Sequence, residues 1–172
     1  MQVKYKSIEH ERTQDAPFVG AMVSAVGCPF NCPGCFNQHL KDMPTLYSTA
    51  EGIIAEIKKN PFNEGIILGG LEWSTYPVEL YNLVRTASRN GLKVMIYTGM
   101  TEKEFDQKVG VVLLGAFIND DFYIKFGEYA VEQEPIDKVE FGVNLASSNQ
   151  YIVKFKKDGS RCEVGGNSCT VC

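Results

Sequence analysis

The six cysteines of this 172-residue chain fall into two groups, and the first group has the spacing of a metal site. Cys28, Cys32 and Cys35 form the pattern CxxxCxxC, so three thiolates on one short loop can converge on one metal centre. A structural zinc site uses four ligands, and an electron-transfer cubane cluster gives each of its irons a cysteine. Three local cysteines therefore predict a 4Fe–4S cluster with one iron left open for a substrate.

Two other interpretations of the first group remain open. His39 lies four residues after Cys35 and is the right residue type to complete a zinc site. Alternatively, one of the C-terminal thiols completes a four-cysteine cluster. Ligand identity separates the three interpretations, because only the first leaves a coordination position for a small molecule.

The second group, Cys162, Cys169 and Cys172, lies within the last eleven residues, among several glycines. It is consistent with a second metal site, either zinc or an auxiliary cluster that takes one ligand from elsewhere. It is equally consistent with a redox-active dithiol of Cys169 and Cys172, or with a flexible tail whose thiols have no function. We therefore divide the chain into a domain over 1–158 and a cysteine-rich tail over 159–172.

Composition favours a soluble globular protein of one domain. Hydrophobic residues make up 44% of the chain and charged residues 22%, and 17 basic against 21 acidic residues give a net charge of -4. This balance offers no general attraction for nucleic acid or for an anionic membrane. The start, Met1 to Arg12, is polar, and the longest apolar run, 109–118, is about half the length of a membrane-spanning helix. We expect a cytoplasmic protein, whose reducing surroundings favour thiols as metal ligands over disulfides.

The sequence predicts that alternating strands and helices position the cysteines. Apolar runs predict parallel strands at 19–26, 65–68, 93–98 and 109–114, with less regular later strands at 139–145 and 151–155. Helices are predicted between them, with capping boxes at 48–51 and 101–104 and a helix that begins near Pro77 and stops at Gly91. This order is typical of an α/β fold with a mostly parallel sheet. The cysteine loop then leaves the carboxyl end of the first of these strands, where such folds place their chemistry.

A set of motifs in a fixed order gives the chain a family resemblance. CxxxCxxC after a strand resembles the cluster motif of the radical S-adenosylmethionine superfamily, and CPGCFN, residues 32–37, is similar to the activating proteins of anaerobic ribonucleotide reductases. A glycine pair at 69–70, the sequence YTG at 97–99 and SSNQ at 147–150 follow in the same order, so the resemblance spans about 17–153. It implies a single domain built as an incomplete (β/α) barrel.

The resemblance implies which residues bind the cofactors. Cys28, Cys32 and Cys35 would hold the 4Fe–4S cluster, whose open iron binds the amino and carboxylate groups of S-adenosylmethionine. Gly34, Cys35 and Phe36 would lie along the adenosyl group. The glycine pair Gly69 and Gly70 would let the backbone approach the methionine end.

One position departs from the family pattern. The acidic residue that takes the ligand's ammonium group typically follows the glycine pair directly. Here Leu71 intervenes, the acid is Glu72, and Trp73 replaces the usual proline.

The resemblance also implies the reaction and the partners. An electron would cleave S-adenosylmethionine to methionine and a 5'-deoxyadenosyl radical, which would then form a glycyl radical on an anaerobic ribonucleotide reductase. A low-potential donor such as flavodoxin or ferredoxin would supply the electron. Two other functions remain open: radical chemistry on a small molecule or a peptide, and an iron–sulfur electron-transfer or zinc-binding module.

Overall fold

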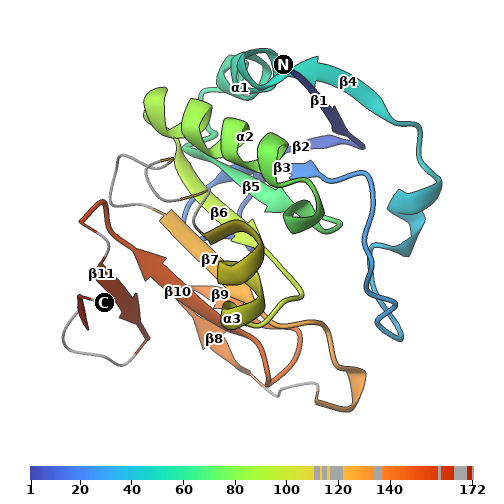
Figure 1. The fold of residues 1–172 in the computed structure, drawn as a ribbon, viewed down its shortest axis with the longest axis vertical. Coiled ribbons are helices and arrows are strands. Elements are labelled where there is room, and N and C mark those ends of the chain that lie inside the picture. The colour runs from blue at the N-terminus through green and yellow to red at the C-terminus, as the bar shows by residue number, and fades with distance from the viewer. Residues whose placement is uncertain are drawn as a thin grey trace.

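The computed structural model describes residues 1–110, 113, 116, 122–133, 137–158, 160–164, 170 and 171. The described chain has a mixed α/β fold built on one large sheet with the strand order β12-β11-β10-β7-β6-β5-β3-β2 (Figure 1). Its strands are β2 (Ile8–Arg12), β3 (Gly20–Ser24), β5 (Gly65–Gly69), β6 (Lys93–Tyr97), β7 (Phe122–Phe126), β10 (Tyr151–Phe155), β11 (Ser160–Glu163) and β12 (Thr170–Val171). Two small antiparallel sheets pair β1 (Gln2–Tyr5) with β4 (Leu46–Thr49), and β8 (Val139–Glu140) with β9 (Val143–Asn144).

Four adjacent strands, β3, β5, β6 and β7, form the parallel centre of the large sheet. The strands on either side pair antiparallel to this centre, β2 with β3 and β10 with β7. Helices α1 (Ala50–Lys59), α2 (Pro77–Arg89) and α3 (Glu102–Phe105) lie between successive parallel strands along the chain. The predicted α/β fold is therefore confirmed, together with the strands expected at 19–26, 65–68 and 93–98.

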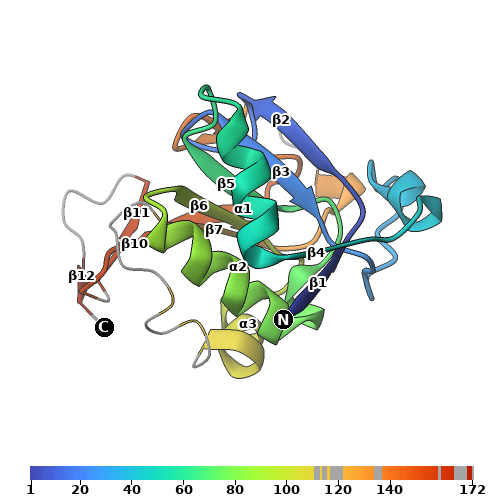
Figure 2. The same ribbon diagram turned by 90° about the horizontal axis from the view of Figure 1, so that it is seen from above.

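Helices α1, α2 and α3 pack on one face of the parallel strands, as two views at right angles show (Figures 1 and 2). The core on this side joins Ile53 and Ile57 of α1 and Leu80 of α2 to Leu68 and Ile96 of the sheet, all of them buried. The opposite face carries a second, smaller apolar cluster, which is covered by the segment around β9 and by the residues before β3. Its members are Ala16, Phe18, Met22, Ile67, Met95, Tyr123, Val143, Leu145 and Ile152.

Helix caps differ in one place from the sequence prediction. Thr101 and Glu104 form the predicted capping box of α3, with donation in both directions. The box predicted from Ser48 to Glu51 is wrong by one residue, because Thr49 is the N-cap of α1 and its hydroxyl accepts a hydrogen bond from the backbone N–H of Gly52 at 3.0 Å. Two threonines thus satisfy amides that the first helical turn leaves unpaired.

The strand predicted at 109–114 is wrong in its described part. Residues Asp106–Gly110 form a π-helix, and Leu113 is helical. A short apolar run cannot be assigned to strand or helix by periodicity alone, which explains the error. The fourth parallel strand is instead β7, and the segment predicted as one strand at 139–145 forms the hairpin β8–β9.

Several short structures join the main elements. Within the described ranges, 3-10 helices span Gln38–Asp42, Trp73–Thr75 and Val131–Gln133. The N-terminal strands β1 and β2 were not expected from the polar start of the chain. The longest described helix, α2, has 13 residues, and the described ranges hold no helix with the length and apolarity that crossing a bilayer requires.

Candidate iron–sulfur and ligand site

A cavity lies at the carboxyl ends of the four parallel strands. Each strand is followed by a loop that contributes to its wall: the cysteine loop after β3, residues 70–72 after β5, residues 98–99 after β6 and residues 127–129 after β7. The lining residues are Cys28, Phe30, Cys32, Cys35, Asn37, Gly70, Leu71, Glu72, Tyr97, Thr98, Gly99, Lys125, Gly127, Glu128, Tyr129 and Gln150. This is the edge at which parallel sheets bind ligands, because the loops from several strands meet there.

The three cysteines predicted as cluster ligands all line this cavity. Cys28, Cys32 and Cys35 are free thiols and partly buried. A tight turn brings two of them together, since the backbone N–H of Cys35 donates to the carbonyl of Cys32 at 3.2 Å and Gly34 between them has a φ of 71°. The donor set fits an iron–sulfur cluster, and no other described residue of the lining is a cysteine or a histidine.

Burial acts on two of the three thiols, Cys28 and Cys32. Burial raises the pKa of Cys28, against donation from the backbone N–H of Phe30, which lowers it. Burial also raises the pKa of Cys32, against donation from the backbone N–H of Tyr129. Within the described part of the chain, no group of three His, Cys, Asp or Glu side chains is already gathered around a metal position. Metal binding to Cys28 and Cys32 would release their thiol protons, because the thiolate is the form that binds a metal.

The cysteine loop is anchored against the loop after β6. The ring of Phe30 lies so close to Gly99 that a Cβ on Gly99 would come within 2.8 Å of two ring carbons. Glycine at this position of the YTG motif therefore makes room for an aromatic side chain of the cysteine loop.

A tight turn after β5 brings Glu72 into the cavity in spite of the inserted Leu71. The backbone N–H of Leu71 donates to the carbonyl of Gly69 at 2.9 Å, and Gly70 at the centre has a φ of 71°, which is the pattern of a γ-turn. This turn sends Leu71 into the core, where it is buried. The next residue, Glu72, lines the cavity, so a carboxylate reaches the site although Leu71 separates it from the glycine pair.

The Glu72 carboxylate is buried and joins two loops. It is only 3% exposed. Its Oε1 accepts from the backbone N–H of Ser74 at 3.0 Å, and its Oε2 accepts from the backbone N–H of Gly99 at 2.8 Å. Trp73, the next residue, is fully buried and donates from Nε1 to the carbonyl of Val23 at 2.9 Å. The acid is thus fixed in position by the segments that follow β5 and β6.

Lys125 is a site residue that the sequence analysis missed. It is the only basic residue among the described lining residues and is 9% exposed. Burial lowers the pKa of Lys125 to about 8, while the charges of Glu72 and Cys32 act in the opposite direction. A lysine within the apolar strand FYIKF was the available signal, because a buried lysine in a strand needs a partner.

The SSNQ motif holds the loop after β7. Gln150, 2% exposed, donates from Nε2 to the carbonyl of Gly127 at 3.2 Å and accepts at Oε1 from the backbone N–H of Ala146 at 3.1 Å. Ser147 accepts at Oγ from the N–H of Ala130 at 3.2 Å, and Asn149 donates to the carbonyl of Glu128 at 3.0 Å. These contacts fix the loop that bears Tyr129.

Three residues expected at the ligand do not line the cavity. Phe36 is 69% exposed and packs on Tyr129, with ring centroids 5.2 Å apart. Gly34 is exposed at the turn of the cysteine loop, and Gly69 ends β5 behind the lining residue Gly70. His39 also lies outside the lining, with its Nδ1 3.1 Å from the carbonyl of Phe36, so this structure does not place it as a fourth ligand.

Cys162 is the described member of the second cysteine group, and it does not line the cavity. Cys162 lies in β11 opposite Lys154 of β10 and takes part in a disulfide bond. Its partner, and the predicted ligands Cys169 and Cys172, lie outside the described residues.

Comparison with known proteins gives one family. A family model described as a 4Fe-4S single cluster domain matches residues 19–152, which is more than half of the chain. This range includes the three cysteines of the first group and every described residue that lines the cavity. No curated protein matches the chain.

Proposed function

The chain belongs to the family of 4Fe-4S single cluster domains, and from this premise we propose that it is a radical S-adenosylmethionine enzyme that forms a glycyl radical on an anaerobic ribonucleotide reductase. The observation that carries the proposal is the donor set of the cavity. Three cysteines line it, and its other described lining residues include no fourth cysteine or histidine. A cubane held by three thiolates leaves one iron for an outside ligand.

The charged residues of the cavity suit the amino acid end of S-adenosylmethionine. Glu72 and Lys125 supply one buried negative and one buried positive group in the same cavity. A ligand that carries both an ammonium and a carboxylate can pair with each, and such charge-assisted hydrogen bonds are the stronger kind. In this proposal Glu72 binds the ammonium group, and Lys125 binds the carboxylate.

The cysteine loop and the loop after β7 suit the adenosyl end. Tyr129 lines the cavity, and the exposed ring of Phe36, which does not line it, packs against Tyr129. Adenine is flat and apolar on its faces, and aromatic side chains offer it a stacking surface. Gly34 and Cys35 would then lie along the ribose.

The bound cluster supplies a single electron for cleavage of the sulfonium carbon–sulfur bond. The protein's own residues orient the ligand and keep water from the reacting bond, while Cys28, Cys32 and Cys35 hold the cluster. The fold would act as an incomplete (β/α) barrel over 1–158. Such a barrel leaves one side open to a glycine-bearing loop of the reductase, and flavodoxin or ferredoxin would donate the electron.

Reconstitution without oxygen tests the proposal. Wild-type protein treated with iron and sulfide should bind about four irons per chain and, once reduced, convert S-adenosylmethionine to methionine and 5'-deoxyadenosine. Cys28→Ser, Cys32→Ser and Cys35→Ser should each lose most of the iron. Cys162→Ser is the matched control, because Cys162 does not line the cavity, and it should keep the iron.

Two results would contradict the proposal. Spectroscopy that finds four protein ligands on the cluster would indicate an electron-transfer module. Zinc bound in place of iron would indicate a structural site. Transfer of the radical is tested separately, by the electron paramagnetic resonance signal of a glycyl radical on an added anaerobic ribonucleotide reductase. Cleavage without such a signal would instead favour a small molecule or peptide as the substrate.

A further inference from the structure

Tyr97 and Lys125 are direct neighbours across two parallel strands. They are paired in the register of β6 and β7, so their side chains leave the sheet on the same face. Two residues earlier along the strands, the same face carries an apolar row of Met22, Ile67, Met95 and Tyr123. Tyr97 and Lys125 therefore lie at the boundary between this apolar row and the cavity.

The ring of Tyr97 supports the ammonium group of Lys125. Nζ of Lys125 lies 5.0 Å from the ring centroid, within the range of a cation–π contact. Its hydrogen bond to the carbonyl of Gly127 is long, at 3.4 Å. The ring is thus a main partner of a buried cation.

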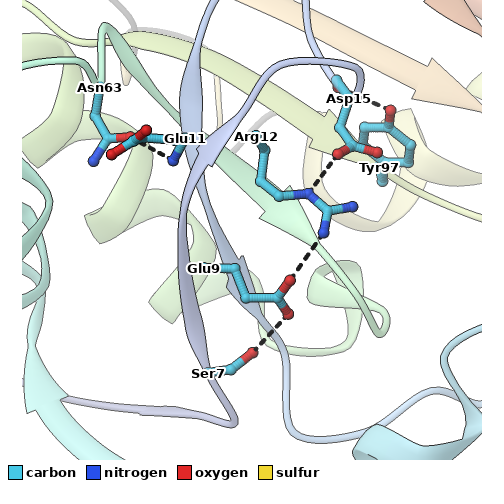
Figure 3. A network of polar contacts seen from close by, with 7 residues as sticks. All are labelled: Ser7, Glu9, Glu11, Arg12, Asp15, Asn63 and Tyr97. Carbon is cyan, nitrogen blue, oxygen red and sulfur yellow. Dashed lines mark hydrogen bonds and ion pairs between the residues drawn. The ribbon is translucent and has the colours of Figure 1, made fainter.

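The segment before β3 fixes the position of the Tyr97 side chain. Its hydroxyl donates to the carbonyl of Asp15 at 2.8 Å. The Asp15 carboxylate is paired with Arg12 at 2.7 Å, and Arg12 also contacts Glu9 at 2.9 Å. Figure 3 shows this chain of contacts running from the N-terminal segment to the Tyr97 ring. A ring held in this way has little freedom to turn.

The position of the ammonium matters because Glu72 lies in the same cavity. The charge of Glu72 acts on Lys125, yet the ion pairs of the described residues include none between these two. A flexible lysine without the ring would be free to move to the carboxylate, and the two charges would then neutralise each other. Neither would remain for a ligand.

We infer that Tyr97 is a positioning residue that holds the Lys125 ammonium apart from Glu72, so that the cavity selects ligands with a carboxylate group. The inference rests on the proposed function for the identity of the ligand, S-adenosylmethionine. It assigns to the first residue of the YTG motif a role in recognition, exerted through Lys125.

Binding of two ligands to the reconstituted protein tests the inference. The probes are S-adenosylmethionine and its decarboxylated analogue, which keeps the sulfonium, the amine and the adenosine. Tyr97→Leu should weaken binding of S-adenosylmethionine by about 5- to 30-fold, the range expected for loss of a desolvated cation–π contact. Its affinity for the analogue should change by less than about 2-fold, because the analogue has no carboxylate for Lys125.

Tyr81→Leu is the matched control. Tyr81 also lies under a cation, with Arg85 5.7 Å from its ring centroid, but it belongs to α2 and does not line the cavity. Its loss should leave both affinities unchanged.

A shape-preserving series guards against misfolding of Tyr97→Leu. Tyr97→Phe keeps the ring, and replacement of Tyr97 by fluorinated phenylalanines withdraws electrons from the ring face with little change in size. Affinity for S-adenosylmethionine should fall stepwise with fluorination, while affinity for the analogue stays level. Equal losses for both ligands, or no loss for either, would overturn the role of Tyr97. Wild-type protein that binds neither ligand would instead refute the proposed function.

Discussion

Gly70 is predicted to be the glycine of the site that tolerates a side chain least. Two independent costs act on Gly70→Ala. Its φ of 71° is a left-handed conformation, which costs a residue with a Cβ about 1–2 kcal/mol. In addition, the new Cβ would lie 2.4 Å from Oγ and 2.7 Å from Cβ of Ser24. Crowding of this kind in a packed region costs about 1–3 kcal/mol, so the total loss of unfolding free energy is about 2–5 kcal/mol.

Gly91 separates the two costs. Its φ is 75°, and a Cβ there would meet no atom within 4 Å. Gly91→Ala should therefore lose only the backbone part, about 1–2 kcal/mol. Both variants are measured by denaturant unfolding of the metal-free, reduced protein, followed by circular dichroism. Ser24→Gly removes both crowding atoms, so combining it with Gly70→Ala should recover about 1–3 kcal/mol in a double-mutant cycle. Equal losses for Gly70→Ala and Gly91→Ala would refute the reasoning.

Three further predictions concern the cavity wall. Gln150→Ala removes two hydrogen bonds of a side chain that is 2% exposed. It should cost about 2–3 kcal/mol in unfolding free energy; a loss below about 0.5 kcal/mol would contradict the role of Gln150 in holding the loop after β7. Gly99→Ala pushes against the Phe30 ring and should lower the iron bound after reconstitution more than Gly91→Ala does, as iron analysis would check. Burial lowers the pKa of Lys125 from 10.5 to about 8 in the folded state, so the unfolded chain binds more protons between these two pH values. The unfolding free energy of the metal-free protein should therefore rise by up to about 3 kcal/mol, relative to that of Lys125→Met, as pH rises from about 8 to 10.5. Parallel stability profiles of the two proteins over that window would show that Lys125 is not buried in its charged form.

Several elements of the fold could be predicted because their signals are local. The strands at 19–26, 65–68 and 93–98 are continuous apolar runs, which strands covered on both faces require. Helix α2 is marked at both ends, by Pro77 in its first turn and by Gly91, with a φ of 75°, just beyond its end. In each case the physical cause lies within a few residues of the effect.

Other elements could not be predicted because distant residues decide them. Strands β1 and β2 begin the chain with few apolar residues, and they form because β4 and β3 offer them edges for backbone pairing. The run at 109–114 was predicted as a strand, although its described residues are helical. Its position in the sheet is taken by β7, whose fourth residue, Lys125, interrupts the apolar pattern.

By itself, the sequence determined the three thiols of the first cysteine group, their spacing and the strand that they follow, since these depend only on order along the chain. Only the tertiary structure decided which groups face those thiols. Glu72 reaches the cavity because a three-residue turn buries the inserted Leu71. Lys125 meets Tyr97 because the register of two parallel strands places them side by side. Contacts between neighbouring strands depend on register and packing, and a list of residues carries neither.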